Sequence, residues 1–365
     1  MTPGGAQLGG RLCICVGAGG VGKTTVAAAI ARSRAAQGQR VAVVTIDPAP
    51  RLAQALGLDE LSGKPRRVSG AGELWAMRLD PKRTLDELIA SLAPDEATRD
   101  RALSNRIYRE LSAAVAGSQE FSAVAKLYEL NRSGDFDAIV LDTPPSRNAL
   151  DFLDAPARLV RFFDGRALRL LLSQSSLATR VASRAGAPLF NMLGRLTGAA
   201  VLREITAFFL AIAGMIDGLA ARAAAVQALL HEPDTTFVLV SSPRREALEE
   251  AIAFAAELGR AELTVAALVV NRMHSVDDAL GAPAELESVL GARLAALVRE
   301  SVDELASLAA ADATALSRLR DAFPNLDPLL VPQLAGEVED LAGLARVARY
   351  LESPSSTGTS PSAAQ

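Results

Sequence analysis

A glycine-rich loop between an apolar run and a helical pattern constrains this chain more than any other feature. Residues 16–25 read VGAGGVGKTT and fit the pattern G-x-x-x-x-G-K-[ST], in which Lys23 and Thr24 are the last two positions. The apolar run Leu12–Val16 precedes the loop, and helical spacing follows it over Val26–Ala36. A strand, a glycine loop and a helix in this order predict the phosphate-binding loop of a parallel α/β sheet.

The residue types in this loop suit the phosphates of a nucleotide. Glycines let successive backbone N–H groups turn toward a phosphate, and the following helix directs the positive end of its dipole at the same oxygens. Lys23 adds a cation that stabilises charge developing on the γ-phosphate, and Thr24 places a hydroxyl where Mg²⁺ bridges the β- and γ-phosphates. A glycine turn that serves only tight packing is the plain alternative, and the flanking elements argue against it. The predicted contacts of ATP are Gly17, Ala18, Gly19, Gly20, Val21, Gly22, Lys23, Thr24 and Thr25.

Two further apolar runs end in an acid. Residues 136–142 (FDAIVLD) close on Asp142, in the arrangement by which a strand-end Asp holds a magnesium-bound water beside the first strand. Residues 41–47 (VAVVTID) close on Asp47, which could orient the water that attacks the γ-phosphate or accept its proton. An Asp at a strand end is also a common turn former. We predict Asp142, with Thr24, as the metal site and Asp47 as a catalytic residue beside the loop lysine.

Apolar runs with strand character recur along the chain, and helical patterns follow most of them, as in a parallel sheet covered on both faces. The fold class expected is therefore α/β with a doubly wound, mostly parallel sheet of the P-loop NTPase kind. The predicted strands are Leu12–Val16, Val41–Ile46, Ala138–Leu141, Thr236–Val240 and Leu263–Val270.

Long Ala/Leu/Arg-rich stretches at helical spacing interrupt this pattern at about 81–133 and 156–232. We interpret them as a helical subdomain inserted into one P-loop ATPase domain that spans 1–350. The nucleotide-binding core of that domain then comprises 11–80, 134–155 and 234–350. The segment 353–365 contains only Ser, Thr, Pro, Gly, Ala and Gln and is predicted to be disordered.

Composition and charge exclude several classes of function. The chain has 38 Lys and Arg against 42 Asp and Glu, a formal charge of −4, which disfavours binding to nucleic acid. Its two cysteines, Cys13 and Cys15, lie in an apolar run, and no Cys-x-x-Cys spacing for zinc exists. The most membrane-like stretch, Ile205–Ile216, has 12 residues, whereas a bilayer span needs about 20. With no secretory signal apparent at residues 1–10, we expect a cytoplasmic protein.

These motifs together resemble the ArsA/guided-entry ATPases, a branch of the deviant-Walker-A (SIMIBI) P-loop proteins. Asp47-Pro48-Ala49 resembles the switch I of this group, whose Asp is the proposed base, and FDAIVLDTPPSRNAL at 136–150 resembles its switch II. Residues 267–272 (ALVVNR) resemble the strand whose final Asn, here Asn271, reads the adenine. Val331-Pro332, with Glu337-Val338 after it, resembles the loop that closes over that base.

The resemblance implies a Mg-ATP-dependent ATPase that works as a homodimer or as a heterodimer with a paralogous ATPase. Hydrolysis in such a dimer would drive a conformational switch that handles a hydrophobic or membrane-associated client. Arsenite pumping is disfavoured, because that activity needs clustered thiols and the two cysteines lie beside the loop strand. We expect neither an arsenite site nor a zinc site. A partition protein of the ParA kind is opposed by the acidic charge balance.

One position departs from the pattern of the group. Its members carry a signature Lys at the second position of the loop, which reaches across a dimer to the partner's phosphates, and here the residue is Ala18. One interpretation is loss of this cation, which leaves an ATP-binding regulatory or scaffold subunit of a hetero-oligomer with little hydrolysis. The other is that a paralogous subunit with Lys, or a nearby Arg such as Arg147, supplies the charge. Such a cation contributes about 10³–10⁵ in rate.

The helical insertion leaves two interpretations open. Apolar residues at 166–172, 189–193 and 208–216 exceed what a single helix stripe needs. They can pack the subdomain or a subunit interface, or they can line a groove for an apolar helix of a client.

Overall fold

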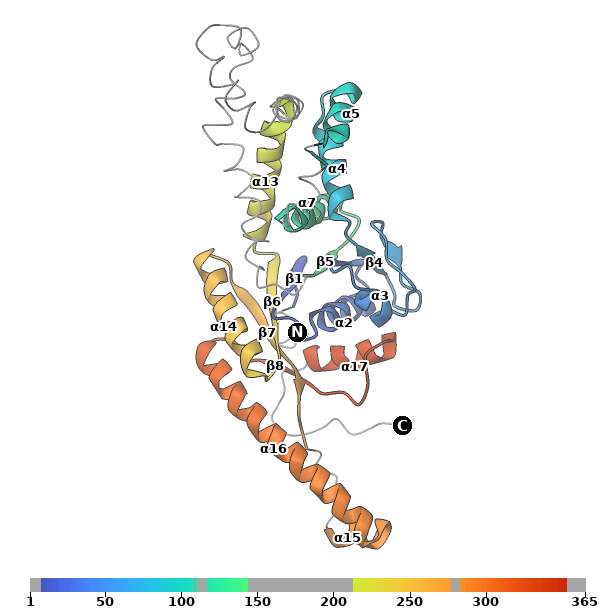
Figure 1. Ribbon diagram of the computed structural model, residues 1–365, viewed down its shortest axis with the longest axis vertical. Coiled ribbons are helices and arrows are strands. Elements are labelled where there is room, and N and C mark those ends of the chain that lie inside the picture. The colour runs from blue at the N-terminus through green and yellow to red at the C-terminus, as the bar shows by residue number, and fades with distance from the viewer. Residues whose placement is uncertain (1–7, 107, 110–116, 144–212, 277–282, 353–365) are drawn as a thin grey trace, which may run out of the picture. The chain divides into compact units, whose positions relative to one another are not determined.

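An eight-stranded sheet forms the centre of the protein in a computed structural model that describes residues 8–106, 108–109, 117–143, 213–276 and 283–352. The strand order is β3-β4-β2-β5-β1-β6-β7-β8, and every neighbouring pair is parallel except β3 with β4 (Figure 1). The fold class predicted from the sequence is therefore confirmed. The strands are β1 Leu12–Val16, β2 Val41–Thr45, β3 Arg66–Arg67, β4 Leu74–Arg78, β5 Ala138–Asp142, β6 Thr235–Ser241, β7 Val265–Met273 and β8 Leu329–Pro332.

The three central strands β1, β2 and β5 are buried at every residue. Burial on both faces is why they read as continuous apolar runs rather than as alternating patterns. The five strands predicted from the sequence are present within three residues at each end. Three strands were not predicted: β3 is an exposed pair of arginines at the sheet edge, β4 carries the mixed sequence LWAMR, and β8 has only four residues.

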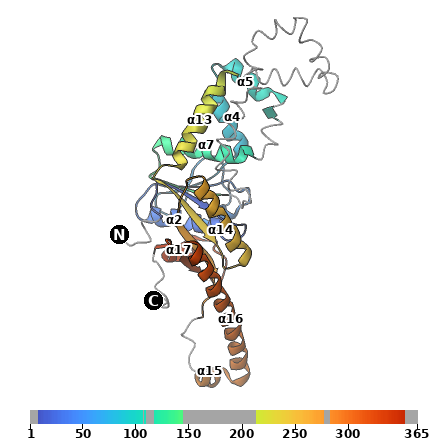
Figure 2. The ribbon, with the colours of Figure 1, turned by 90° about the vertical axis from the view of Figure 1, so that its left-hand side faces the viewer.

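Helices α2 (Lys23–Ala36) and α17 (Leu341–Glu352) lie side by side against the sheet (Figures 1 and 2). Helix α2 presents a row of fully buried alanines, residues 27–29 and 31, to the core. Small side chains at these positions let the helix approach the strands closely, so that the loop before it reaches the end of β1. The remaining helices around the sheet are α3 (Arg51–Ala55) and α14 (Arg245–Arg260).

A pair of helices follows β7 in the sequence. The short α15 (Pro283–Leu290) is followed by α16 (Ala292–Ala322), a helix of 31 residues that contacts α15 and α14 (Figure 2). Gly291, with φ of 77°, makes the turn between them, a conformation that favours glycine.

The chain divides into two compact units, residues 1–78 with 134–149 and 233–365, and residues 79–133 with 150–232. The second unit contains α4 (Pro81–Leu92), α5 (Glu96–Ser104), α7 (Gly117–Ser133), a 3-10 turn at Ala213–Met215 and α13 (Ile216–Leu230). Its core gathers buried apolar residues of these helices, among them Leu88, Ile89, Ala102, Met215 and Leu219.

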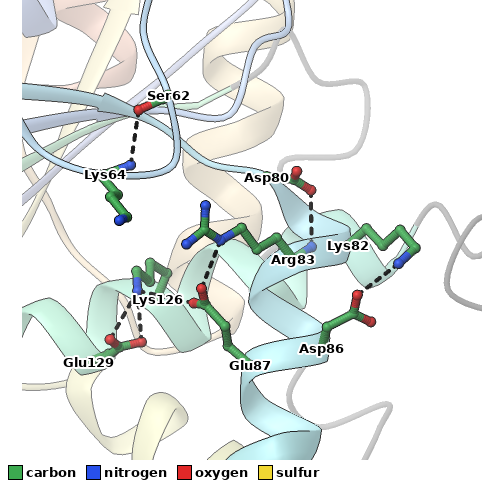
Figure 3. A network of polar contacts seen from close by, with 9 residues as sticks. All are labelled: Ser62, Lys64, Asp80, Lys82, Arg83, Asp86, Glu87, Lys126 and Glu129. Carbon is green, nitrogen blue, oxygen red and sulfur yellow. Dashed lines mark hydrogen bonds and ion pairs between the residues drawn. The ribbon is translucent and has the colours of Figure 1, made fainter. Parts of the chain in front are cut away.

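Local chemistry sets the ends of α4 and α5. Asp80 and Asp95 each accept a hydrogen bond from the backbone three residues on, which caps an exposed helix start. Along α4, Lys82 pairs with Asp86 and Arg83 with Glu87 at i,i+4 spacing, as Figure 3 shows. Exposed pairs of this kind contribute about 0.3–0.5 kcal/mol each, so packing rather than charge holds the unit together.

Several predictions fall outside the described residues: Arg147 and the rest of switch II after residue 143, most of the insertion at 156–232 and the segment 353–365. Among the residues that the structure does describe, no helix is both long enough and apolar enough to span a membrane.

Candidate active site

A cavity of about 1610 Å³ lies at the carboxyl ends of the parallel strands, where ligands bind in open α/β sheets. Lys23 and Asp47 line it from the ends of β1 and β2, and the loop at 333–339 lines it after β8. Two residues predicted for the site, Gly17 and Asp142, do not line the cavity, but each accepts a hydrogen bond from a residue that does, Gly17 from Lys23 and Asp142 from Thr24. The predicted site residues that do line it are Ala18, Gly19, Gly20, Val21, Gly22, Lys23, Thr24, Thr25, Asp47, Asn271 and Pro332.

The loop 17–22 depends on glycine at both of its ends. Gly17 has φ of 148°, and a Cβ there would collide with the carbonyl oxygen of Val240 in β6. Gly22 has φ of 92°, and a Cβ there would collide with the side-chain amide of Asn271. Only glycine combines these backbone angles with so close an approach, so the local sequence itself shapes the loop.

Lys23 begins α2 and is held by the loop that precedes it. Its Nζ donates to the carbonyl oxygens of Gly17 at 2.9 Å and Ala18 at 2.8 Å. Burial lowers the pKa of this ammonium, and the nearby Asp142 and Asp47 act in the opposite direction. An ammonium has three donors, so Lys23 can bind a phosphate oxygen while it stays anchored to the loop.

Asp142 ends β5 and is almost completely buried. Its Oδ2 accepts hydrogen bonds from the hydroxyls of Thr24 and Thr45, both at 2.9 Å. Burial raises the pKa of Asp142 to about 6, although these two hydroxyls and Lys23 lower it in part. Its other oxygen, Oδ1, is buried and accepts no hydrogen bond from any described residue.

These donors fit a magnesium ion bound together with phosphate. Carboxylate and hydroxyl oxygens are the ligands Mg²⁺ prefers, and it usually keeps several waters and takes few protein ligands. The buried Oδ1 of Asp142 accepts no hydrogen bond from the described residues, and a magnesium-bound water would donate one to it. Within the described part of the chain, no group of three or more His, Cys, Asp or Glu could hold a metal without such help.

Asp47 follows β2 and is oriented by three contacts. Its Oδ1 accepts from the backbone of Ala49 at 2.9 Å, its Oδ2 lies 3.2 Å from Nη1 of Arg51, and its own N–H donates to the hydroxyl of Thr45 at 3.2 Å. Thr45 thus bonds to both acids, since its hydroxyl also donates to Asp142. The carboxylate of Asp47 is fixed at the cavity wall, where it could orient a water.

Sequence reasoning missed Thr45 and Arg51. Asp47 and Arg51 are only four residues apart in the sequence, which was an available signal for an ion pair, although the residues between them form a turn rather than a helix. The role of Thr45 had no such signal, because its contact with Asp142 spans 97 residues.

The opposite side of the cavity carries Asn271 and Pro332, from the ends of β7 and β8. The Nδ2 of Asn271 donates to the carbonyl of Val21 at 2.9 Å, and its Oδ1 accepts from the backbone N–H of Arg272 at 3.0 Å. Arg272 has φ of 64°, in the left-handed region, which turns the chain sharply after Asn271. Asn271 is therefore tied to the phosphate loop.

His274 and Asp312 also line this side of the cavity and were given no role from the sequence. Oδ2 of Asp312, on α16, accepts from the backbone N–H of His274 at 2.7 Å and lies 2.9 Å from its Nδ1. This pair ties α16 to the end of β7.

Ala18 is buried within the loop, with 6% of its surface exposed. Position 18 therefore presents no charge to the cavity. This is so whether the missing lysine makes the chain a slow regulatory subunit or another residue supplies the charge.

Comparison with known proteins identifies the family. The ATPase get3 of Schizosaccharomyces pombe is 29% identical over 258 residues, 70% of this chain and 71% of that protein. The ATPase GET3 of Rhodotorula glutinis is 29% identical over 258 residues, 70% and 68% of the two chains. The ATPase GET3A of Arabidopsis thaliana is 28% identical over 263 residues, 72% and 67%. A family model described as "Anion-transporting ATPase" matches residues 11–282, well over half of the chain. The chain therefore belongs to the anion-transporting ATPase family, the nucleotide-binding ArsA group that it resembles in sequence, and it is an ATPase.

Proposed function

We propose that the protein is a cytoplasmic, Mg-ATP-dependent ATPase that closes as a dimer and uses hydrolysis to drive a conformational switch. The observation that carries this proposal is the bonded set around Thr45. Its hydroxyl joins Asp142, the partner of Thr24, to Asp47 at the cavity wall. The set brings a metal-site acid, a candidate base and Lys23 to one end of the phosphate loop.

Each residue has a role in the proposed reaction. The backbone N–H groups of residues 17–22 and the ammonium of Lys23 bind the phosphates, and the hydroxyl of Thr24 with Asp142 holds the metal and its waters. When bound, Mg²⁺ neutralises charge on the β- and γ-phosphate oxygens. Asp47 orients a water and accepts its proton as the water oxygen bonds to the γ-phosphorus. The bond to the bridging oxygen then breaks, and ADP and phosphate leave.

The base of the nucleotide belongs on the far side of the cavity. We assign Asn271 to the adenine edge and Pro332 to a contact with its face, because both line the cavity beyond the phosphate loop. The bond from Asn271 to Val21 supports this assignment, since it fixes the amide beside the loop. Glu337 and Val338, in the loop after β8, line the same side.

The dimer contact we propose is the face of α15 and α16. Large apolar side chains are exposed there, with Val289 79%, Leu294 49% and Leu297 52% accessible. Leu290 and Leu308 extend this face along the same two helices. Leu294, Leu297 and Leu308 lie at helical spacing on one stripe, which suits a second ATPase subunit, either a copy of this chain or a paralogue.

The client is proposed from the resemblance to the guided-entry group and from the apolar composition of residues 156–232. A switch of this kind would bind a hydrophobic or membrane-associated segment in one nucleotide state and release it in the other.

A second candidate function is favoured by Ala18. A chain without the trans cation can bind ATP and hydrolyse it slowly, as the regulatory subunit of a hetero-oligomer whose partner carries the lysine. In this case hydrolysis would rise when the paralogous subunit is added.

Calorimetry with Mg-ATP and Mg-GTP tests the proposal. We expect saturable binding of Mg-ATP at one site per chain and weaker binding of Mg-GTP, because Asn271 is assigned to adenine. The same samples with a fluorescent apolar probe should give different probe binding with ATP and with ADP. Folded protein that binds neither nucleotide would contradict the proposal, and probe binding that ignores the nucleotide would contradict the client switch.

A further inference from the structure

The strand order gives the cavity two chemically different sides. From β1, where the phosphate loop begins, β5 and β2 lie on one side and β6, β7 and β8 on the other. Asp142 and Asp47 end strands on the first side, while Asn271 and Pro332 end strands on the second. A nucleotide whose β-phosphate lies in the loop therefore has its γ-phosphate toward β2 and its base toward β7.

The positively charged side chains that line the cavity also fall on these two sides. Arg244 follows β6 and Arg272 lies near the end of β7, on the side of the base. On the side of the γ-phosphate, the cations that line the described cavity are Lys23 and Arg51. Lys23 is bound to two carbonyls of its own loop, whereas the Arg51 side chain is 61% exposed and, among the described residues, is hydrogen-bonded to Asp47 alone.

Arg51 is the first residue of α3, four residues after Asp47, and its Nη1 lies 3.2 Å from Oδ2 of that carboxylate. Burial is the main cause that lowers the pKa of Lys23, and the positive charge of Arg51 lowers it further, so the two cations act on the same region. A guanidinium has five donors in a planar fork, which matches a carboxylate and a phosphate at once. Arg51 can therefore stay paired with Asp47 and also reach a phosphate oxygen.

We propose that Arg51 is a catalytic residue that contacts the γ-phosphate of ATP and supplies, within the same chain, the positive charge that position 18 lacks. Charge spreads over the γ-phosphate oxygens as the bond to ADP breaks, and a guanidinium in contact with them stabilises that charge. Arg51 neither gives nor takes a proton in this step. The proton of the attacking water goes to Asp47. The inference rests on the proposed roles of Asp47, Asp142 and Asn271.

The test compares Arg51→Ala with wild-type protein in single-turnover hydrolysis and in nucleotide binding. We expect hydrolysis to slow by about 10³-fold. Affinity for Mg-ATP should fall about tenfold while affinity for Mg-ADP stays the same, because only ATP has a γ-phosphate. Arg51→Lys should lose less hydrolysis and less Mg-ATP affinity than Arg51→Ala, since lysine retains the charge without the planar fork. Arg66→Ala is the control, because it removes an exposed arginine of the same unit that does not line the cavity and should change neither quantity.

A second comparison separates contact with the phosphate from mere support of Asp47. In an Asp47→Asn background, removal of Arg51 should still weaken Mg-ATP binding and leave Mg-ADP binding unchanged. An unchanged ATP affinity in that background would overturn the proposal, as would wild-type hydrolysis by Arg51→Ala or an equal loss of ATP and ADP affinity. Failure of the proposed function would look different, because wild-type protein would then not bind Mg-ATP at all.

Discussion

Thr45 holds the two acids of the site in one arrangement. Its hydroxyl donates to Asp142 and accepts from the N–H of Asp47, and the residue itself is 1% exposed. A buried carboxylate needs such partners, because burial without hydrogen bonds is costly. The arrangement of the candidate site therefore depends on a residue to which we assign no chemical role.

The pKa of Asp142 predicts how metal binding depends on pH. Burial raises this pKa to about 6, so the carboxylate is ionised at pH 7 and mostly protonated at pH 5. A protonated carboxyl attracts Mg²⁺ weakly, so the apparent Mg²⁺ affinity of the ATP-bound protein should fall about tenfold per pH unit below 6. Magnesium titrations between pH 5 and 8 would measure this. Asp142→Asn should bind Mg²⁺ more weakly at every pH and lose the dependence, and a wild-type affinity that is flat across this range would refute the assignment.

Among single residues, the sequence could predict those whose role depends on their immediate neighbours in the chain. The loop from Gly17 to Thr24 is specified by consecutive glycines and by one Lys-Thr pair, so its residues could be named before the structure. Thr45 was missed because only the fold brings it to Asp142, 97 residues away, whereas Arg51 was missed although Asp47 is only four residues from it. The roles of the predicted site residues stay predictions until the variants are measured.

Among the elements, the turn from β1 into α2 has the least tolerance for change. Gly17→Ala would place a methyl group against the carbonyl oxygen of Val240 and force φ of 148° on a residue with a side chain. We expect a loss of at least about 3 kcal/mol in the free energy of unfolding, since strain and a backbone collision add. Denaturant unfolding without nucleotide would measure this.

The control for this substitution lies in the same loop. Gly20 has φ of 75°, and a Cβ there meets nothing within 4 Å. Gly20→Ala should therefore cost only the left-handed penalty of about 1–2 kcal/mol. Equal losses for the two variants would show that the approach to Val240 does not govern the loop.

The elements that could be predicted from the sequence are those buried on both faces. Their apolar runs are long enough to be distinct, as in β1, β2 and β5. The edge strands β3 and β8 and the neighbour of β3, β4, carry mixed or brief patterns, which periodicity alone does not separate from loops. The order of strands also needed the structure, because β5 lies between β1 and β2 although β2 ends at Thr45 and β5 begins only at Ala138.

For the whole molecule, the subunit contact that we propose on the exposed face of α15 and α16 can be tested directly. We expect wild-type protein with Mg-ATP to form dimers, alone if it is a homodimer or with a paralogue if it is a heterodimer. The double substitution Leu294→Glu and Leu297→Glu places two charges on the apolar stripe and should leave monomers, because an unpaired charge in an apolar contact is costly. Sedimentation or mass photometry would measure the assembly. Mg-ATP affinity should persist, since neither Leu294 nor Leu297 lines the cavity. Ala310→Glu adds a charge to the exposed opposite side of α16 and should leave the dimer intact. A double variant that still forms dimers would place the subunit contact elsewhere.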